Sequence, residues 1–212
     1  MLTKKDLASV QKHLTHYDEV REEILSLSRT ATRLASSAIL HIHRGDIDEA
    51  TSEVSKIEQT LEKISSLSND FSEFKSAQSV IVAFQEYVEA VTLRTFAVND
   101  RIPSLSELRS DHRTYLLGLL DAVGEFRRMA LNSLRRGEVG RAEKLLEGME
   151  GIYDDLQTLE HTSIVPTFRV KMDAARRIIE STRGDVVTEV RRFALEQALN
   201  RLDKRMDSHS KN

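Results

Sequence analysis

Residues 84–91 (FQEYVEAV) form an apolar stretch that carries two acids, Glu86 and Glu89. The stretch has the composition of a helix, and on an α-helix residues three or four apart lie on one face, about 5 to 6 Å from each other. The spacing therefore predicts that the two carboxylates form a pair on one side of this helix.

A second stretch, residues 115–126 (YLLGLLDAVGEF), repeats the pattern with Asp121 and Glu125. Burying a carboxylate costs several kcal/mol unless it is paired, protonated or bound to a cation. Four acids on two otherwise apolar helices therefore need a compensating partner. We expect that partner to be a divalent metal ion.

The ligand types narrow the choice of metal. The chain has no cysteine, and no histidine lies next to the four acids. Carboxylate oxygens favour Mg²⁺, with Mn²⁺ as the alternative, over zinc. A ferritin-like di-iron centre needs Glu-x-x-His on two helices, and neither stretch has it. Mg²⁺ held by carboxylates is suited to hydrolysis of phosphodiesters or nucleotides.

The alternative interpretation is that the four acids are structural. Glu-x-x-Glu occurs by chance in many helices, and the acids could face solvent or pair across helices with Arg94, Arg127 or Arg128.

Composition predicts an all-α fold. The 212 residues include only 8 glycines and 2 prolines, and aromatic residues make up 5%, which suits helices better than sheets. No Gly/Ser-rich linker divides the chain, so we expect a single domain over residues 1–212.

Cysteine usage and charge restrict where the protein works and what it binds. The absence of cysteine does not suit an oxidising compartment, and no apolar run approaches the roughly 18 residues of a membrane span. We expect a soluble, cytoplasmic protein without membrane contact. Because the net charge is −3, nucleic acid would have to be held by a local basic lining.

Hydrophobic periodicity predicts seven long helices, with a short helical turn capped at Ser104 before the fourth. Three glycines, at positions 45, 137 and 184, each follow an arginine and precede an acid. We predict that a helix ends at each of them. Asp46 is read as the N-cap of the second helix, and Pro166 as the break after the fifth. The expected helices are Leu7–Arg44, Asp46 to a polar break at Ser65–Asp70, Phe71–Val98, Arg113–Arg136, Val139–Glu160, Thr167–Arg183 and Val186–Met206.

Basic residues on these helices have two interpretations. Arg29 and Arg33 are four apart on one face of the first helix, and each could contact phosphate or belong to a solvated face. The same alternatives apply to Lys171, Arg176 and Arg177.

Several segments resemble the translin family, on the side of translin-associated protein X, the catalytic branch. The most specific are residues 85–91, 115–118 and 121–133, which contain the four acids. The similarity spans about Tyr17 to Gly184 in the same order, and includes residues 17–22 and 27–29.

The resemblance implies a seven-helix α/α-superhelical subunit that assembles into a hollow octamer, binds RNA or single-stranded DNA inside, and cleaves RNA with Mg²⁺. It implies that Glu86, Glu89 and Asp121 bind the metal. Glu125 would complete the shell or orient the attacking water. Candidate RNA contacts are Arg29, Arg33 and Arg128.

The chain lacks the long insertion before the fourth helix and the extended tail of animal members, which favours an archaeal-type homo-oligomer. The leading hypothesis is therefore a Mg²⁺-dependent endoribonuclease that binds and cleaves single-stranded RNA inside an oligomeric shell, with single-stranded DNA or duplex RNA as further ligands.

Two alternatives remain. One is an all-α nucleoside triphosphate pyrophosphohydrolase, which also uses Glu-x-x-Glu but usually closes with Glu-x-x-Asp. The other is a non-catalytic oligomer that binds single-stranded nucleic acid.

Overall fold

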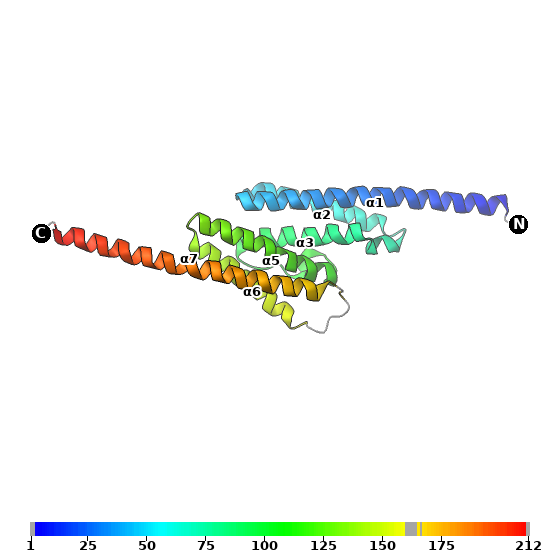
Figure 1. Ribbon diagram of the computed structural model, residues 1–212. Helices are drawn as coiled ribbons and strands as arrows, with labels where there is room; N and C mark the ends of the chain where they lie inside the picture. Colours follow the sequence, from blue (N-terminus) through cyan, green and yellow to red (C-terminus); the bar gives the residue numbers. More distant parts are fainter. Residues whose placement is uncertain (1–2, 160–164, 166, 211–212) are drawn as a thin grey trace. The chain divides into compact units, whose positions relative to one another are not determined.

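The computed structural model describes residues 3–159, 165 and 167–210. In this part of the chain it contains seven α-helices, one 3-10 helix and no strand (Figure 1), which confirms the all-α prediction. The chain divides into two compact units. Unit 1 comprises Met1–Asn99 and Pro103–Leu119, and unit 2 comprises Asp100–Ile102 and Leu120–Asn212. The expectation of a single domain stays a prediction.

Unit 1 is built on three helices that pack against one another. They are α1 (Lys4–Arg44), α2 (Ile47–Leu67) and α3 (Gln78–Asn99) (Figure 1). Between and after them lie the 3-10 helix η1 (Ser72–Ser76), the short helix α4 (Leu105–Leu108) and the start of α5 (His112–Arg135). Ile24, Ile57 and Val88, one from each long helix, are almost fully buried in the core.

The junction between α1 and α2 follows the predicted glycine signal. Gly45 has φ 88°, in the left-handed region that favours glycine, and its N–H donates to the carbonyl groups of His41 and Ile42. Asp46 is the N-cap residue of α2 as expected, but its side chain makes no capping hydrogen bond. Its Oδ2 lies 3.6 Å from Nδ1 of His41 instead.

The predicted start of the third helix at Phe71 is wrong. The structure has η1 there, and α3 begins only at Gln78, after Ala77 in an extended conformation. The rings of Phe71 and Phe74 pack on Tyr17 of α1, with centroids 5.0 and 4.8 Å away. Tertiary packing of these aromatic rings therefore overrides the helical pattern.

The approach of α5 to α3 within unit 1 is very close. A Cβ atom placed on Gly118 would lie 2.7 Å from Cβ of Val88 and 2.8 Å from the carbonyl oxygen of Gln85. No side chain fits at this position unless the two helices move apart. At its start, α5 is held by Asp111, whose Oδ1 accepts hydrogen bonds from the N–H groups of Arg113 and Thr114.

Unit 2 consists of the rest of α5 together with α6 (Val139–Gln157) and α7 (Phe168–Ser210). Phe126, Leu145 and Met149 are fully buried in its core. Gly137 has φ 75°, so the predicted glycine end of α5 is confirmed. Helix α6 ends at Gln157, while Glu160 and Pro166, where sequence analysis places the next boundary, lie outside the described residues.

The predicted break at Gly184 is wrong, because α7 is one helix that passes through it. Contacts on both sides of the glycine hold the helix. Arg183 donates from Nε to Oε1 of Glu150 on α6 at 2.8 Å, and Asp185 Oδ2 lies 3.1 Å from Nη2 of Arg127 on α5. Two predicted helices are therefore a single 43-residue helix.

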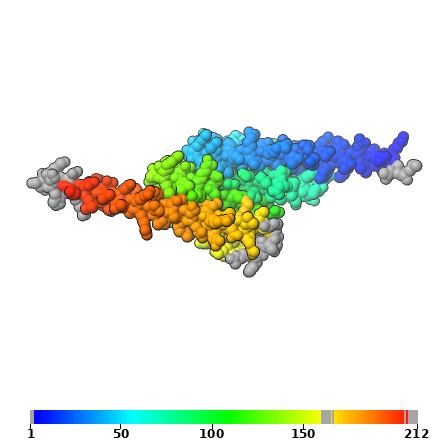
Figure 2. Space-filling view, viewed as in Figure 1, coloured from blue at the N-terminus to red at the C-terminus, as the bar shows by residue number. Residues whose placement is uncertain are grey.

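Apolar side chains are exposed near both ends of the described chain, which Figure 2 colours blue at the start and red at the end. The first turns of α1 expose Leu7, Val10 and Leu14, and the last part of α7 exposes Leu195, Leu199 and Leu202. No described helix is both long enough and apolar enough to cross a membrane.

The close contact at Gly118 predicts the effect of adding a methyl group. Gly118→Ala should lower the free energy of unfolding by about 1–3 kcal/mol, because the new Cβ overlaps a backbone carbonyl. Gly184→Ala is the matched control: it lies inside a helix with open space around it, so alanine should raise stability by about 0.5–1 kcal/mol. Urea unfolding at one protein concentration measures both. Equal effects of the two substitutions would contradict the close contact.

Candidate functional site

The first carboxylate pair lies on α3 in unit 1. Glu86 and Glu89 are half-buried, whereas Tyr87, Val88 and Ala90 between and beside them are buried. The pair therefore sits at the margin of the core, where carboxylates remain accessible to a ligand while their backbone is held by packing.

Tyr87, which lies between the two glutamates in the sequence, is held by Glu58 of α2. Its hydroxyl donates a hydrogen bond of 3.0 Å to Oε1 of Glu58. Burial raises the pKa of the Tyr87 phenol above its ordinary value, and the negative charge of Glu58 adds to the effect. The hydrogen bond holds the turn of α3 that carries both glutamates.

The second pair lies on α5 in unit 2. The side chains of Asp121 and Glu125 are 30% and 26% exposed. Lys171 of α7 forms an ion pair with Asp121 through Nζ and Oδ1. Nη1 of Arg128 lies 3.5 Å from Oε2 of Glu125. Both acids thus have a cationic neighbour within unit 2.

Arg127, one of the arginines named in the structural alternative, contacts α7. Its Nη1 donates to Oγ1 of Thr182 at 2.8 Å, and its Nη2 lies 3.1 Å from Oδ2 of Asp185. Arg127 therefore connects α5 to α7. Of the three arginines named as structural partners, Arg128 shows a contact with a predicted site acid, Glu125.

The two pairs belong to different units, so each is described on its own. Within each unit, the described residues contain no group of three or more histidine, aspartate or glutamate side chains placed to hold a metal ion. A metal site shared by Glu86, Glu89, Asp121 and Glu125 stays a prediction.

The three predicted RNA contacts are all exposed. Arg29 and Arg33 lie on α1 in unit 1, and Arg128 lies on α5 in unit 2. Arg128 is 57% exposed although it neighbours Glu125, so its guanidinium remains available to a phosphate.

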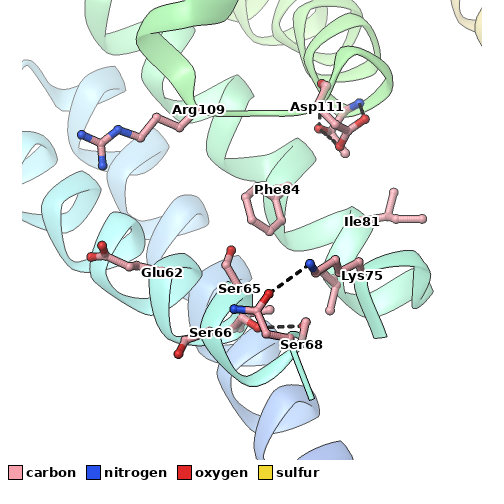
Figure 3. A pocket seen from close by; sticks show the side chains of 13 residues that line it. Glu62, Ser65, Ser66, Ser68, Lys75, Ile81, Phe84, Arg109 and Asp111 are labelled. Carbon is pink, nitrogen blue, oxygen red and sulfur yellow. Dashed lines mark hydrogen bonds between the residues drawn. The ribbon is translucent and has the colours of Figure 1, made fainter. Parts of the chain in front are cut away.

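A cavity of about 640 Å³ in unit 1 is lined by none of the predicted site residues (Figure 3). Figure 3 shows the ring of Phe84 in the middle of its lining, with Arg109 and Lys75 on different sides of the ring. Glu62 and Asp111 also line it, so two acidic and two basic side chains balance in charge. This lining does not select an anion by charge, and we assign it no role.

The described chain is an all-α protein with one carboxylate pair on α3 and another on α5. The sequence model of the translin family matches residues 19–181. The chain belongs to the translin family, so the resemblance drawn from the sequence is confirmed.

Relatives and solved structures agree with this assignment. The chain is 35% identical to an uncharacterised protein of Methanocaldococcus jannaschii over 90% of its own length and 85% of the relative. It is 22% identical to the translin-associated protein X homolog of Schizosaccharomyces pombe, over 93% and 92% of the two chains.

Two solved structures have the same fold. The crystal structure of apo-NeC3PO has a TM-score of 0.81, with 26% identity over 89% of this chain and 98% of that one. The structure of AfC3PO in complex with duplex RNA has a TM-score of 0.77, with 31% identity over 86% and 95%.

Sequence reasoning did not find the ion pair between Lys171 and Asp121. It named Lys171 only as a candidate phosphate contact or a solvated residue. The two residues lie far apart in the chain, and periodicity relates only residues that share a helix, so no signal in one sequence could pair them.

The hydrogen bond between Tyr87 and Glu58 predicts a pH-dependent stability. The pKa of Tyr87 is raised on folding, so its contribution is fully present below the unfolded value of about 10 and is lost as the pH rises above it. Tyr87→Phe should cost about 1 kcal/mol at pH 8, and the difference from the wild type should shrink above pH 10. Urea unfolding at the two pH values measures it. A difference that grows with pH would contradict the raised pKa.

Proposed function

We propose that this protein is a metal-dependent endoribonuclease that binds and cleaves single-stranded RNA as a homo-oligomer. The observation that carries the proposal is the presence of two half-buried carboxylate pairs, one on α3 and one on α5, in a member of the translin family.

The donor set fits Mg²⁺ or Mn²⁺, because all four ligands are carboxylates and the chain has no cysteine. A bound divalent ion would activate a water molecule and stabilise the leaving oxygen at the scissile phosphate. Glu86, Glu89 and Asp121 would hold the ion, and Glu125 would complete the shell or orient the water.

RNA binding is supported by a similar protein, AfC3PO, whose structure was determined with duplex RNA. In this chain the exposed Arg29, Arg33 and Arg128 supply positive charge for phosphates. The net charge of −3 requires that basic residues act locally, which several subunits around one strand would allow. The preference for single strands over duplex RNA is our hypothesis.

A homo-oligomer is supported by apolar side chains left exposed in the single chain. Leu7, Val10 and Leu14 of α1 and Leu195, Leu199 and Leu202 of α7 are each more than half exposed. Exposed apolar clusters of this kind are typical of surfaces that other subunits cover. We expect an octamer from the resemblance to the family.

Family membership favours this function over a nucleoside triphosphate pyrophosphohydrolase. A non-catalytic oligomer that binds nucleic acid remains the main alternative, and removal of one carboxylate distinguishes it from the enzyme.

Glu89→Gln should reduce cleavage of an end-labelled single-stranded RNA by about 100-fold or more, because one oxygen ligand loses its charge. EDTA should abolish cleavage by the wild type. Glu143→Gln, which changes an exposed glutamate on α6, is the matched control and should cleave normally.

Internal cuts that survive both EDTA and Glu89→Gln would refute a metal site at the acids. If the wild-type protein binds the RNA but does not cut it, the result would support the non-catalytic oligomer. A duplex RNA run in parallel tests the preference for single strands.

Substitution of Arg29 and Arg33 together by glutamine should weaken RNA binding and make it less sensitive to salt. Each lost phosphate contact should lower the slope of log affinity against log salt by about 0.7 on a single strand. The double substitution of Lys4 and Lys5 by glutamine, which removes two exposed charges from the first turn of α1, is the control. Filter binding between 50 and 200 mM salt measures the slopes, and equal slopes would exclude both arginines as contacts.

A further inference from the structure

The ion pair between Lys171 and Asp121 joins a candidate metal ligand to the first turn of α7. Phe168, the first residue of α7, is 5% exposed and anchors the start of that helix, and Lys171 lies three residues further along it. The N–H of Lys171 donates to the carbonyl oxygen of Thr167 at 3.0 Å. The side chains of Lys171 and Asp121 are 27% and 30% exposed. The lysine therefore reaches Asp121 from a fixed backbone position, and the contact is partly shielded from solvent.

A simple structural role does not fully account for this pair. Helices α5 and α7 are already joined by Arg127, which contacts both Thr182 and Asp185. Lys171 instead places its charge on the acid that is predicted to bind a metal ion. An ammonium group is a compact charge on a flexible four-carbon stem, so it can leave a carboxylate without movement of the helix.

A divalent cation and the Lys171 ammonium would compete for the same carboxylate. Both are positively charged, and in a partly buried setting two cations at one oxygen atom repel each other strongly. Binding of one must therefore weaken binding of the other, and the two effects are equal in free energy.

We propose that Lys171 is a positioning residue that holds Asp121 in the metal-free protein and is displaced from it when a divalent cation binds. This inference rests on the proposed metal site. The lysine neutralises Asp121 before the ion arrives and sets the cation concentration at which the site fills.

Titration calorimetry of the RNA-free protein with Mg²⁺ tests the exchange. Lys171→Met should bind Mg²⁺ about fivefold or more tightly than the wild type, because the competing charge is gone. Lys171→Arg keeps the charge and should bind with nearly wild-type affinity. Arg183→Met is the matched control, since it removes another ion pair of α7, the one with Glu150, and should leave the affinity unchanged.

Thermal unfolding provides a second readout that does not depend on activity. In EDTA, Lys171→Met should have a lower melting temperature than the wild type, because the Lys171 charge beside Asp121 is gone. Saturating Mg²⁺ should bring the melting temperature back to that of the wild type. Arg183→Met should also lower the melting temperature, and this decrease should persist in Mg²⁺. Lys171→Gln keeps a hydrogen-bond donor without the charge and takes the place of Lys171→Met if that variant does not fold.

The outcomes separate this inference from the proposed function. Equal or weaker Mg²⁺ affinity in Lys171→Met, with clear binding by the wild type, would overturn the exchange and leave the metal site standing. Absence of Mg²⁺ binding by both proteins would overturn the metal site and the exchange together.

Discussion

The contact between α3 and α5 at Gly118 is the constraint on which unit 1 depends. The backbone of α5 lies so close to Val88 and to the carbonyl oxygen of Gln85 that even one added carbon atom overlaps them. These two residues of α3 flank Glu86, and Tyr87 beside it is tied to α2 by Glu58. The segment that carries the first carboxylate pair is therefore held on two sides, and a ligand would meet side chains whose backbone is already in place.

Within unit 2, basic side chains of α5 and α7 form ion pairs between these two helices. Arg127 connects the two helices through Thr182 and Asp185, and Lys171 neutralises Asp121. A carboxylate that is balanced by a displaceable lysine avoids the cost of an unpaired buried charge and remains able to accept a stronger cation. Under the proposed exchange, this ion pair would let the chain fold with Asp121 partly buried before a metal ion binds.

Local chemistry made much of the fold predictable. Scarce glycine and proline, together with 3.6-residue periodicity, indicated helices, and the glycines at 45 and 137 marked true ends, because both adopt a positive φ that other residues avoid. The same signal was wrong at Gly184. There the neighbouring Arg183 and Asp185 are held by α6 and α5, and these contacts keep the helix continuous. Phe71 likewise fits a helix by pattern, but its ring packs on Tyr17 and the backbone forms a 3-10 turn.

For the candidate site, the sequence by itself determined the two carboxylate pairs, since residues three or four apart share a helix face whatever the helix packs against. It also determined the family, because the resemblance drawn from segments around the acids agrees with the family model, which matches residues 19–181. Only the tertiary structure decided that Asp121 forms an ion pair with Lys171 and that Arg127 contacts Thr182 and Asp185 of α7. The physical reason is that such pairs form between helices distant in the chain, and their partners are selected by packing, which periodicity along one helix does not encode.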